Sequence, residues 1–109
     1  MNEQQFYNAI RVLAADTKIL QRNAKKLAIY AQRNKKDKCK TLFDKIAFDT
    51  AYLKALYNKI QTWAYWNKGK IDESEWQVFT KEFDGLFSSL DTVIENIKKR
   101  NEVMANGNS

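Results

Sequence analysis

The sequence contains no histidine, no proline, one cysteine and three glycines among its 109 residues. The lack of histidine excludes Ser-His-Asp and Cys-His catalysis and any zinc site with imidazole ligands. A single cysteine excludes a disulfide framework and a cysteine-rich metal centre. Three glycines leave little for a phosphate-binding loop or a dinucleotide fingerprint. We therefore expect no cofactor and no bound metal, and we expect that the protein is not an enzyme.

Long apolar runs are missing as well. The longest, such as Val12–Ala15, are only about four residues, whereas a membrane-spanning helix needs about 20. The first residues contain no basic, apolar leader of the kind that directs secretion. From these features we expect a cytoplasmic protein that does not cross a membrane.

The residues that are present suit one packed domain. Hydrophobic residues make up 44% of the chain, which is enough for a core. The last five residues are small and polar. We predict a single helical-bundle domain over residues 1–104 and a flexible C-terminal tail over residues 105–109.

Three stretches repeat apolar residues at alternating steps of three and four, the spacing of a heptad seam on an α-helix. The first comprises Phe6, Ile10, Leu13, Thr17, Leu20, Ala24, Leu27 and Ala31. The second comprises Cys39, Phe43, Ile46, Thr50, Leu53, Tyr57, Ile60 and Ala64. The third comprises Trp76, Phe79, Phe83, Leu86, Leu90, Val93 and Ile97. No stretch alternates with period two over a useful length, so we expect no strand.

Capping residues suggest where these helices begin. Asn2 with Gln5, and Asp72 with Glu75, have the spacing of a capping box, in which each side chain bonds the other residue's backbone N–H. The start of the second helix is open, because either Asp37 or Thr41 fits the cap position.

We predict an all-α fold: an up-down-up antiparallel bundle of three long helices, because the short connections force neighbouring helices to run antiparallel. The second helix has the widest apolar face, so we place it between the other two. The alternative is four helices, if the third helix breaks near Gly85 or the Ser88–Ser89 pair. A heptad face left open could be completed by a second copy, so a homodimer remains an alternative.

Charge is unevenly distributed along the chain, whose formal net charge is +6. Residues 11–40 hold ten Lys or Arg and two Asp, whereas residues 72–97 hold seven acidic residues and one lysine. An antiparallel bundle brings the first reversal beside the far end of the third helix. We call the resulting cationic surface the basic pole; it comprises Arg22, Lys25, Lys26, Arg33, Lys35, Lys36, Lys38, Lys40, Lys98, Lys99 and Arg100.

Two partners suit the basic pole: a protein with an acidic face, which we favour, or the phosphate backbone of DNA or RNA. The segment 33–40 contains no aromatic residue on which bases could stack, and the sequence has no helix-turn-helix or zinc-finger spacing. Sequence-specific readout is therefore unsupported. The simplest alternative is a solvated surface, because Lys and Arg also favour the C-terminal ends of helices.

Four aromatic residues, Trp63, Tyr65, Trp66 and Trp76, lie within 14 residues at the opposite end of the expected bundle. At about 100° per residue, the first three cannot all face one core line. We expect Trp63 and Trp76 to close the core. We treat Tyr65 and Trp66, called the aromatic patch below, as a candidate docking surface, because Tyr and Trp dominate binding hot spots.

Two further residues, Asp49 and Cys39, are candidate sites. Asp49 lies beside the second seam within reach of Lys45, and a half-buried carboxylate can mark a catalytic acid, but no second carboxylate follows at a matching spacing. Cys39 lies among lysines, which favour a reactive thiolate, although a small apolar seam residue is the simpler interpretation.

The leading hypothesis is a non-enzymatic helical-bundle interaction protein that docks a macromolecular partner through the basic pole. An adaptor, a regulatory subunit, or a phage- or plasmid-encoded inhibitor of a host or nucleic-acid enzyme all fit this description. The alternative is a sequence-independent DNA- or RNA-binding protein, such as a small subunit of a ribonucleoprotein complex.

Overall fold

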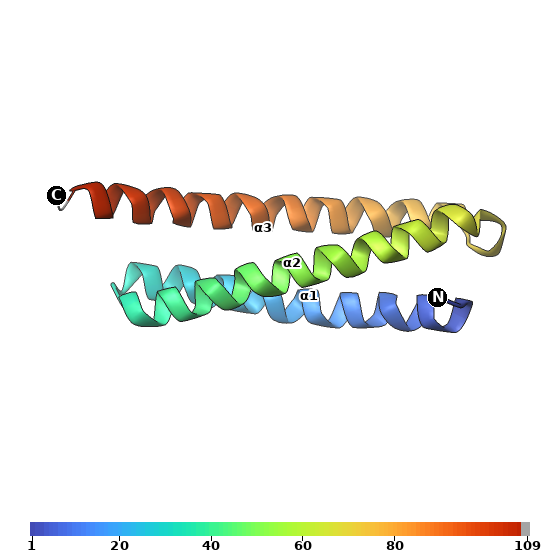
Figure 1. Ribbon diagram of the computed structural model, residues 1–109, viewed down its shortest axis with the longest axis horizontal. Helices are drawn as coiled ribbons and strands as arrows, with labels where there is room; N and C mark the ends of the chain where they lie inside the picture. Colours follow the sequence, from blue (N-terminus) through green and yellow to red (C-terminus); the bar gives the residue numbers. More distant parts are fainter. Residues whose placement is uncertain (108–109) are drawn as a thin grey trace.

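Three long helices make up almost the whole molecule. The computed structural model describes the backbone of residues 1–107 and the side chains of residues 1–99. Helix α1 spans Glu3–Gln32, α2 spans Lys36–Trp66, the 3-10 turn η1 spans Lys68–Lys70, and α3 spans Glu73–Gly107. The molecule is a rod of 58 × 20 × 19 Å (Figure 1).

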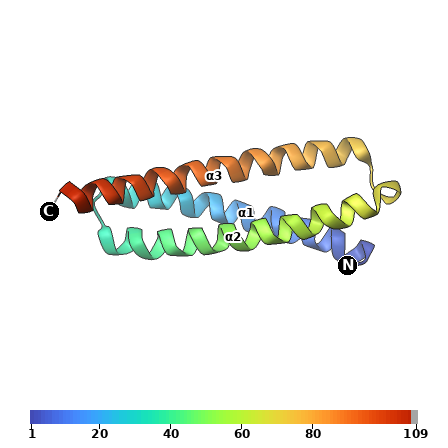
Figure 2. The same ribbon diagram turned by 45° about the horizontal axis from the view of Figure 1, so that its top comes forward.

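The helices run up, down and up, which confirms the predicted antiparallel three-helix bundle (Figure 2). Helix α2 contacts both α1 and α3, as its wide apolar face predicted. Helix α3 passes through Gly85 and the Ser88–Ser89 pair without a break, so the four-helix alternative is wrong. It also continues to Gly107, beyond the domain end expected at residue 104, while residues 108 and 109 lie outside the described part.

The first two seams pack against each other as a heptad repeat predicts. Leu13, Leu27 and Ile60 are fully buried, and Leu20 and Ile46 are 1% exposed. Aliphatic side chains of this size interdigitate closely, so α1 and α2 lie nearer to each other than either lies to α3. This aliphatic interface is the centre of the fold.

Two threonines lie within this interface. The Thr17 hydroxyl donates to the carbonyl oxygen of Leu13 at 2.8 Å, and the Thr50 hydroxyl donates to that of Ile46 at 2.7 Å. Each hydroxyl is therefore satisfied by its own helix and adds no buried unpaired polar group. Their small size lets the two backbones approach.

Helix α3 packs mainly through aromatic rings. Phe79, Phe83 and Phe87 follow one another along α3, and the Tyr57 ring on α2 lies 5.7–6.3 Å from each of the three ring centroids. Aromatic rings at these separations attract one another in addition to burying apolar area. The rings are larger than the aliphatic residues between α1 and α2, so they hold α3 farther away.

The predicted seam of α3 needs one correction. Phe87 and Ile94, which the heptad pattern left out, are buried at 5% and 9% exposure, whereas Leu86 and Val93 are only half-buried. Two adjacent lines of apolar residues run along α3, since it faces both α1 and α2. The buried line is the one nearer to α2 and Tyr57.

The helix starts agree with the sequence at two of three places. The Asn2 side chain accepts from the N–H of Gln5 and the Gln5 side chain accepts from that of Asn2, which forms the expected capping box. Asp72 accepts from the N–H of Glu75 at 3.1 Å and so caps α3, but the described side chains make no return bond from Glu75, so only half of the predicted box forms. Helix α2 instead begins without any side-chain cap, so both proposed caps, Asp37 and Thr41, are wrong.

The first chain reversal explains the missing cap. Asn34 has φ = 55°, in the left-handed region that asparagine tolerates better than most residues. The N–H of Lys35 bonds the carbonyl of Tyr30 at 3.1 Å, and that of Asn34 bonds Ala31 at 3.3 Å, which together form a Schellman motif. The chain re-enters a helix at Lys36 at once, so Lys35 occupies the N-cap position, and its ammonium group has no oxygen with which to accept from the first N–H groups of α2.

The packing predicts a contrast between two neighbouring residues of α1. Leu27→Ala should lower the free energy of unfolding by about 2–5 kcal/mol, because it empties a fully buried site. Ile29→Ala, at a 45% exposed position of the same helix, should change it by less than about 0.5 kcal/mol. Urea unfolding followed by circular dichroism measures both, and equal losses would contradict the burial described above.

Candidate functional site

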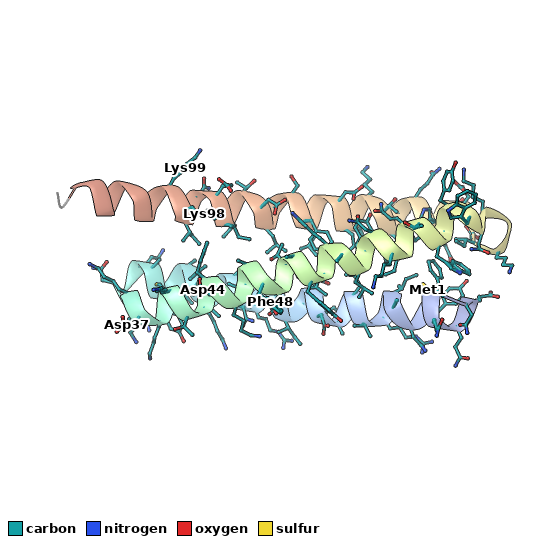
Figure 3. The ribbon with its side chains drawn as sticks, in the orientation of Figure 1. Met1, Asp37, Asp44, Phe48, Lys98 and Lys99 are labelled. Carbon is teal, nitrogen blue, oxygen red and sulfur yellow. The ribbon has the colours of Figure 1, made fainter. Side chains whose placement is uncertain are left out.

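The cations of the predicted basic pole come from three segments of the chain: the second half of α1, the first reversal with the start of α2, and the last described turns of α3. The reversal at residues 33–35 lies at the same end of the rod as the last turns of α3 (Figure 1). Lys98 and Lys99 of α3 lie toward the end of the rod that also holds Asp37, in the first turn of α2 (Figure 3). Ten of the eleven cations have described side chains, and all ten are exposed. The side chain of Arg100 lies outside the described residues.

The ten described cations are spread along the rod, not gathered at a point. Arg22, Lys25 and Lys26 precede the end of α1 by two to three turns, which places them roughly 10–17 Å from the reversal. They extend the cationic surface along the side of α1. A partner that engages all of it must therefore contact an elongated surface.

Few of these cations are neutralised within the molecule. Among the described side chains, only Lys98 of this set is in an ion pair, with Glu95 at 3.9 Å, and both partners are more than half exposed. Such pairs contribute little. The Lys35 and Lys38 ammonium groups lie 5.9 and 5.7 Å from the centroid of the Tyr30 ring. The Tyr30 ring is therefore already engaged by cations.

The aromatic patch is exposed. Tyr65 is 62% and Trp66 77% exposed, and their rings meet edge to face at 5.3 Å. The Lys68 ammonium lies 4.7 Å from the centre of the Tyr65 ring. The rings are thus held against each other while large parts of both stay accessible to a partner.

Trp63 and Trp76 are partly buried and close this end of the core, as the sequence predicted. The Trp63 ring stacks on Phe6 at 4.4 Å, and its N–H donates to the carbonyl oxygen of Met1 at 2.7 Å. Trp76 stacks on Phe79 at 5.3 Å. The Trp76 ring also lies 5.9 Å from the Phe6 ring, so Phe6 contacts both tryptophans and links the ends of all three helices.

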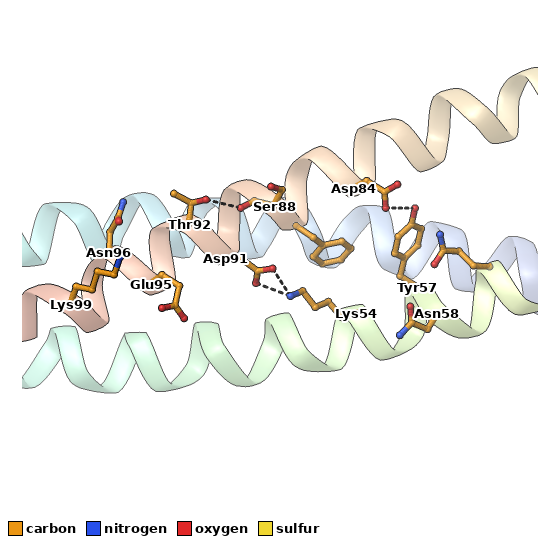
Figure 4. Close-up of a pocket in the computed structure, with 12 residues that line it drawn as sticks. Lys54, Tyr57, Asn58, Asp84, Ser88, Asp91, Thr92, Glu95, Asn96 and Lys99 are labelled. Carbon is orange, nitrogen blue, oxygen red and sulfur yellow. Dashed lines mark hydrogen bonds and ion pairs between the residues drawn. The ribbon is translucent and has the colours of Figure 1, made fainter. Parts of the chain in front are cut away.

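A groove of about 660 Å³, lined mainly by polar residues, runs between α2 and α3 and was not predicted from the sequence (Figure 4). Lys54 crosses it and contacts both carboxylate oxygens of Asp91, at 2.7 and 2.6 Å. The Tyr57 hydroxyl reaches an Asp84 oxygen at 3.0 Å and the Thr80 carbonyl at 3.2 Å. These groups come from different helices, so only the fold brings them together.

Tyr57 is a hydrogen-bond donor in this groove. Burial raises its pKa far above the ordinary value near 10, and the hydrogen bond to the Asp84 carboxylate and the negative charge of that group raise it further. The phenol therefore stays protonated at neutral pH. It links α2 to α3 and does not act as a base.

The other two candidate residues, Asp49 and Cys39, both lie on α2. Lys45 pairs with Asp49 at 3.1 Å, and the Asp49 side chain is 30% exposed, so this carboxylate is half-buried as expected. Asp49 and Asp16 of α1 line one groove between α1 and α2, a proximity that the sequence did not indicate. Cys39 is a free, partly buried thiol packed against the core, in agreement with its place in the seam.

One exposed apolar surface of α1 and α2 was not predicted from the sequence. Phe48 is 73%, Tyr52 57% and Ile19 50% exposed, and all three line a groove of about 350 Å³ between α1 and α2. The available signal was the four-residue spacing of Phe48 and Tyr52 on the side of α2 away from its seam. We call Ile19, Phe48, Tyr52 and the nearby Val12 the outer apolar surface.

Comparison with protein-family models, curated proteins and solved structures finds no match to this chain. Within the described part, no group of three or more acidic or cysteine side chains is placed to hold a metal ion. None of the described helices combines the length and the apolar character that crossing a membrane requires.

The Tyr57 environment predicts a pH dependence of stability. Its contribution is fully present below pH 10 and is lost as the pH rises, because the unfolded chain ionises first. The unfolding free energy of wild type should fall more steeply above pH 10 than that of Tyr57→Phe, by up to about 1 kcal/mol per pH unit. Asp84→Asn should give an intermediate slope, since burial remains. Parallel curves for wild type and Tyr57→Phe in urea unfolding would contradict this role.

Proposed function

We propose that this protein is a non-enzymatic interaction protein, which docks an acidic face of another protein through the basic pole. The observation that carries the proposal is the exposure of all ten described cations, of which only Lys98 has an ion-pair partner among the described side chains. The like charges of this surface repel one another in the free protein, which raises its energy. A negatively charged partner removes that repulsion on binding.

The mechanism is steric docking guided by charge. The field of the basic pole attracts an acidic surface, raises the rate of encounter and selects its orientation. The aromatic patch of Tyr65 and Trp66 supplies a second, short-range contact, because exposed rings bury large areas with little loss of rotamer entropy. The proposed setting is the cytoplasm, as an adaptor, regulatory subunit or inhibitor.

An acidic protein is favoured over a nucleic acid by the state of Tyr30. This is the aromatic ring nearest to Lys35 and Lys38, it is half-buried, and both ammonium groups lie against it. It therefore offers no free platform for stacking a base. Binding to a phosphate backbone without base contacts is the alternative that the experiment must separate.

The proposal predicts the effect of reversing charge at the pole. In the triple variant Lys35→Glu, Lys36→Glu and Lys38→Glu, capture of protein partners from an extract of the native cell should fall about tenfold or more, because the attraction becomes repulsion. Immobilised protein and quantitative mass spectrometry measure the recovery of each captured protein. Circular dichroism checks that helicity is unchanged.

A matched control carries the same total charge with the pole intact. Arg11→Glu, Lys70→Glu and Lys81→Glu change three exposed residues elsewhere, and this variant should recover the same partners as wild type. Equal recovery by both triple variants would remove the pole from the binding site. Random-sequence duplex DNA and single-stranded RNA are titrated in parallel. Retention at low salt with a steep loss as salt rises would replace the protein partner by a nucleic acid.

A further inference from the structure

Helix α2 carries a second heptad line, on the side opposite its buried seam. Its members follow at alternating steps of four and three, and every one of them is exposed. We call this line the outer stripe; it comprises Thr41, Lys45, Phe48, Tyr52, Ala55, Lys59, Thr62 and Trp66. Phe48 lies near the middle of α2 in Figure 3. Heptad spacing keeps these eight residues on one face, whose central aromatic residues, Phe48 and Tyr52, suit packing against another helix, whereas the outer members are mainly polar.

The centre of the outer stripe borders a groove that can receive a side chain. Leu53, which is 2% exposed, lines the groove, and Ile19 borders it from α1. Its volume of about 350 Å³ is large enough for one aromatic ring. Phe48 and Tyr52 line the same groove and are themselves exposed rings. The surface therefore presents two exposed rings, Phe48 and Tyr52, and a groove that can accept a ring of another molecule.

The outer apolar surface is large for a molecule of this size. Its four side chains expose roughly 400 Å² of mainly apolar area, at the scale where such patches mark interaction sites. A stable interface buries about 800 Å² on each side, with an apolar centre and a polar rim. The outer stripe supplies that rim, with Lys45 and Lys59 on either side of the centre.

We propose that the chain forms a two-fold homodimer through this face, with the two α2 helices antiparallel. They cross at the level of Thr50 along α2, although the Thr50 side chain itself is buried on the other side of the helix. Helix α2 spans Lys36–Trp66, so a crossing at this point lies close to its middle and pairs residues 41–59 of each copy, which leaves Trp66 and the basic pole outside the paired segment. Phe48 of one copy then lies opposite Tyr52 of the other. The two-fold axis repeats this ring pair, so the four rings share one apolar centre.

The charges of the stripe complement themselves in this register. Lys59 lies opposite Thr41 of the second copy, and Asp37 and Asp44 lie within one turn of Thr41 on the same side of α2. Among the described side chains, none of these three charged residues is in an ion pair within the monomer. Lys45 lies opposite Ala55, so no two lysines of the stripe face each other.

The antiparallel direction also suits the charge of the whole molecule. Each copy has a formal net charge of +6, and a parallel dimer would place the two basic poles side by side. The antiparallel dimer places them at opposite ends of the assembly. Each pole then lies beside the end of the other copy that carries Glu3, Asp72, Glu73 and Glu75, whose four negative charges exceed the two positive charges of Lys68 and Lys70 there.

The first test is the mass in solution. Sedimentation equilibrium should give wild type twice the chain mass of 12.8 kDa at concentrations of about 0.1 mM. Phe48→Ser should weaken association at least about tenfold. Val78→Ser, at a 60% exposed position on α3 away from this face, should leave it unchanged. Circular dichroism confirms that each variant keeps its helicity, so a lost dimer is not mistaken for a lost fold.

The second test is specific for the register. Lys59→Glu alone, and Asp37→Lys with Asp44→Lys, should each be monomeric, because each copy then sets like charges against each other. An equimolar mixture of the two variants should form a heterodimer, since both charge contacts are restored across the interface. Recovery in the mixture but not in either variant alone supports the antiparallel pairing.

Three results would overturn the proposal. Wild type could remain monomeric throughout the concentration range, which would leave the outer apolar surface to a different partner. Phe48→Ser could dimerise as well as wild type, which would place the interface elsewhere. The mixed variants could fail to associate while wild type dimerises, which would exclude this register.

Discussion

The close aliphatic contact between α1 and α2 is the interaction on which the rest of the structure depends. Leu13, Leu27 and Ile60 exclude solvent completely, and Thr17 and Thr50 satisfy their own hydroxyls without separating the backbones. The hairpin so formed fixes the direction of both helices. It thereby determines that the cations of residues 22–40 lie along the second half of α1 and the start of α2, and that Phe48 and Tyr52 face away from the core.

The third helix packs on the hairpin mainly through aromatic rings, in contrast to the aliphatic contact between α1 and α2. The rings of Phe79, Phe83 and Phe87 surround Tyr57, whereas polar groups such as Lys54 and Asp91 line the groove beside them. Large rings bury much area at a greater interhelical separation. With α3 covering only one side of the hairpin, the opposite side of α1 and α2 has no helix upon it. Three helices therefore leave a surface that a fourth helix would cover.

Periodicity predicted the helices and two of their caps because these are local properties: heptad spacing sets the buried line, and Asn2 and Asp72 bond within one turn. The start of α2 escaped prediction because it depends on the left-handed backbone of Asn34, which a side-chain pattern does not record. The burial of Phe87 in place of Leu86 depends on where α3 sits against two neighbours. The exposure of the basic pole and of Tyr65 followed from charge and helical geometry, whereas the groove at Tyr57 required the tertiary fold.

The unequal spacing of the helices has a consequence for how the native protein opens. Releasing α3 separates rings and exposes a groove whose Lys54 and Asp91 side chains are already about half exposed, whereas separating α1 from α2 disrupts the most fully buried part of the core. We therefore expect the lowest-energy partial opening to be the detachment of α3 from an intact hairpin, a unit of the kind that amide hydrogen exchange resolves. In that open form Phe79, Phe83 and Phe87 of α3 are exposed as a second apolar surface that can bind other chains. The stability of the closed state therefore limits misassociation.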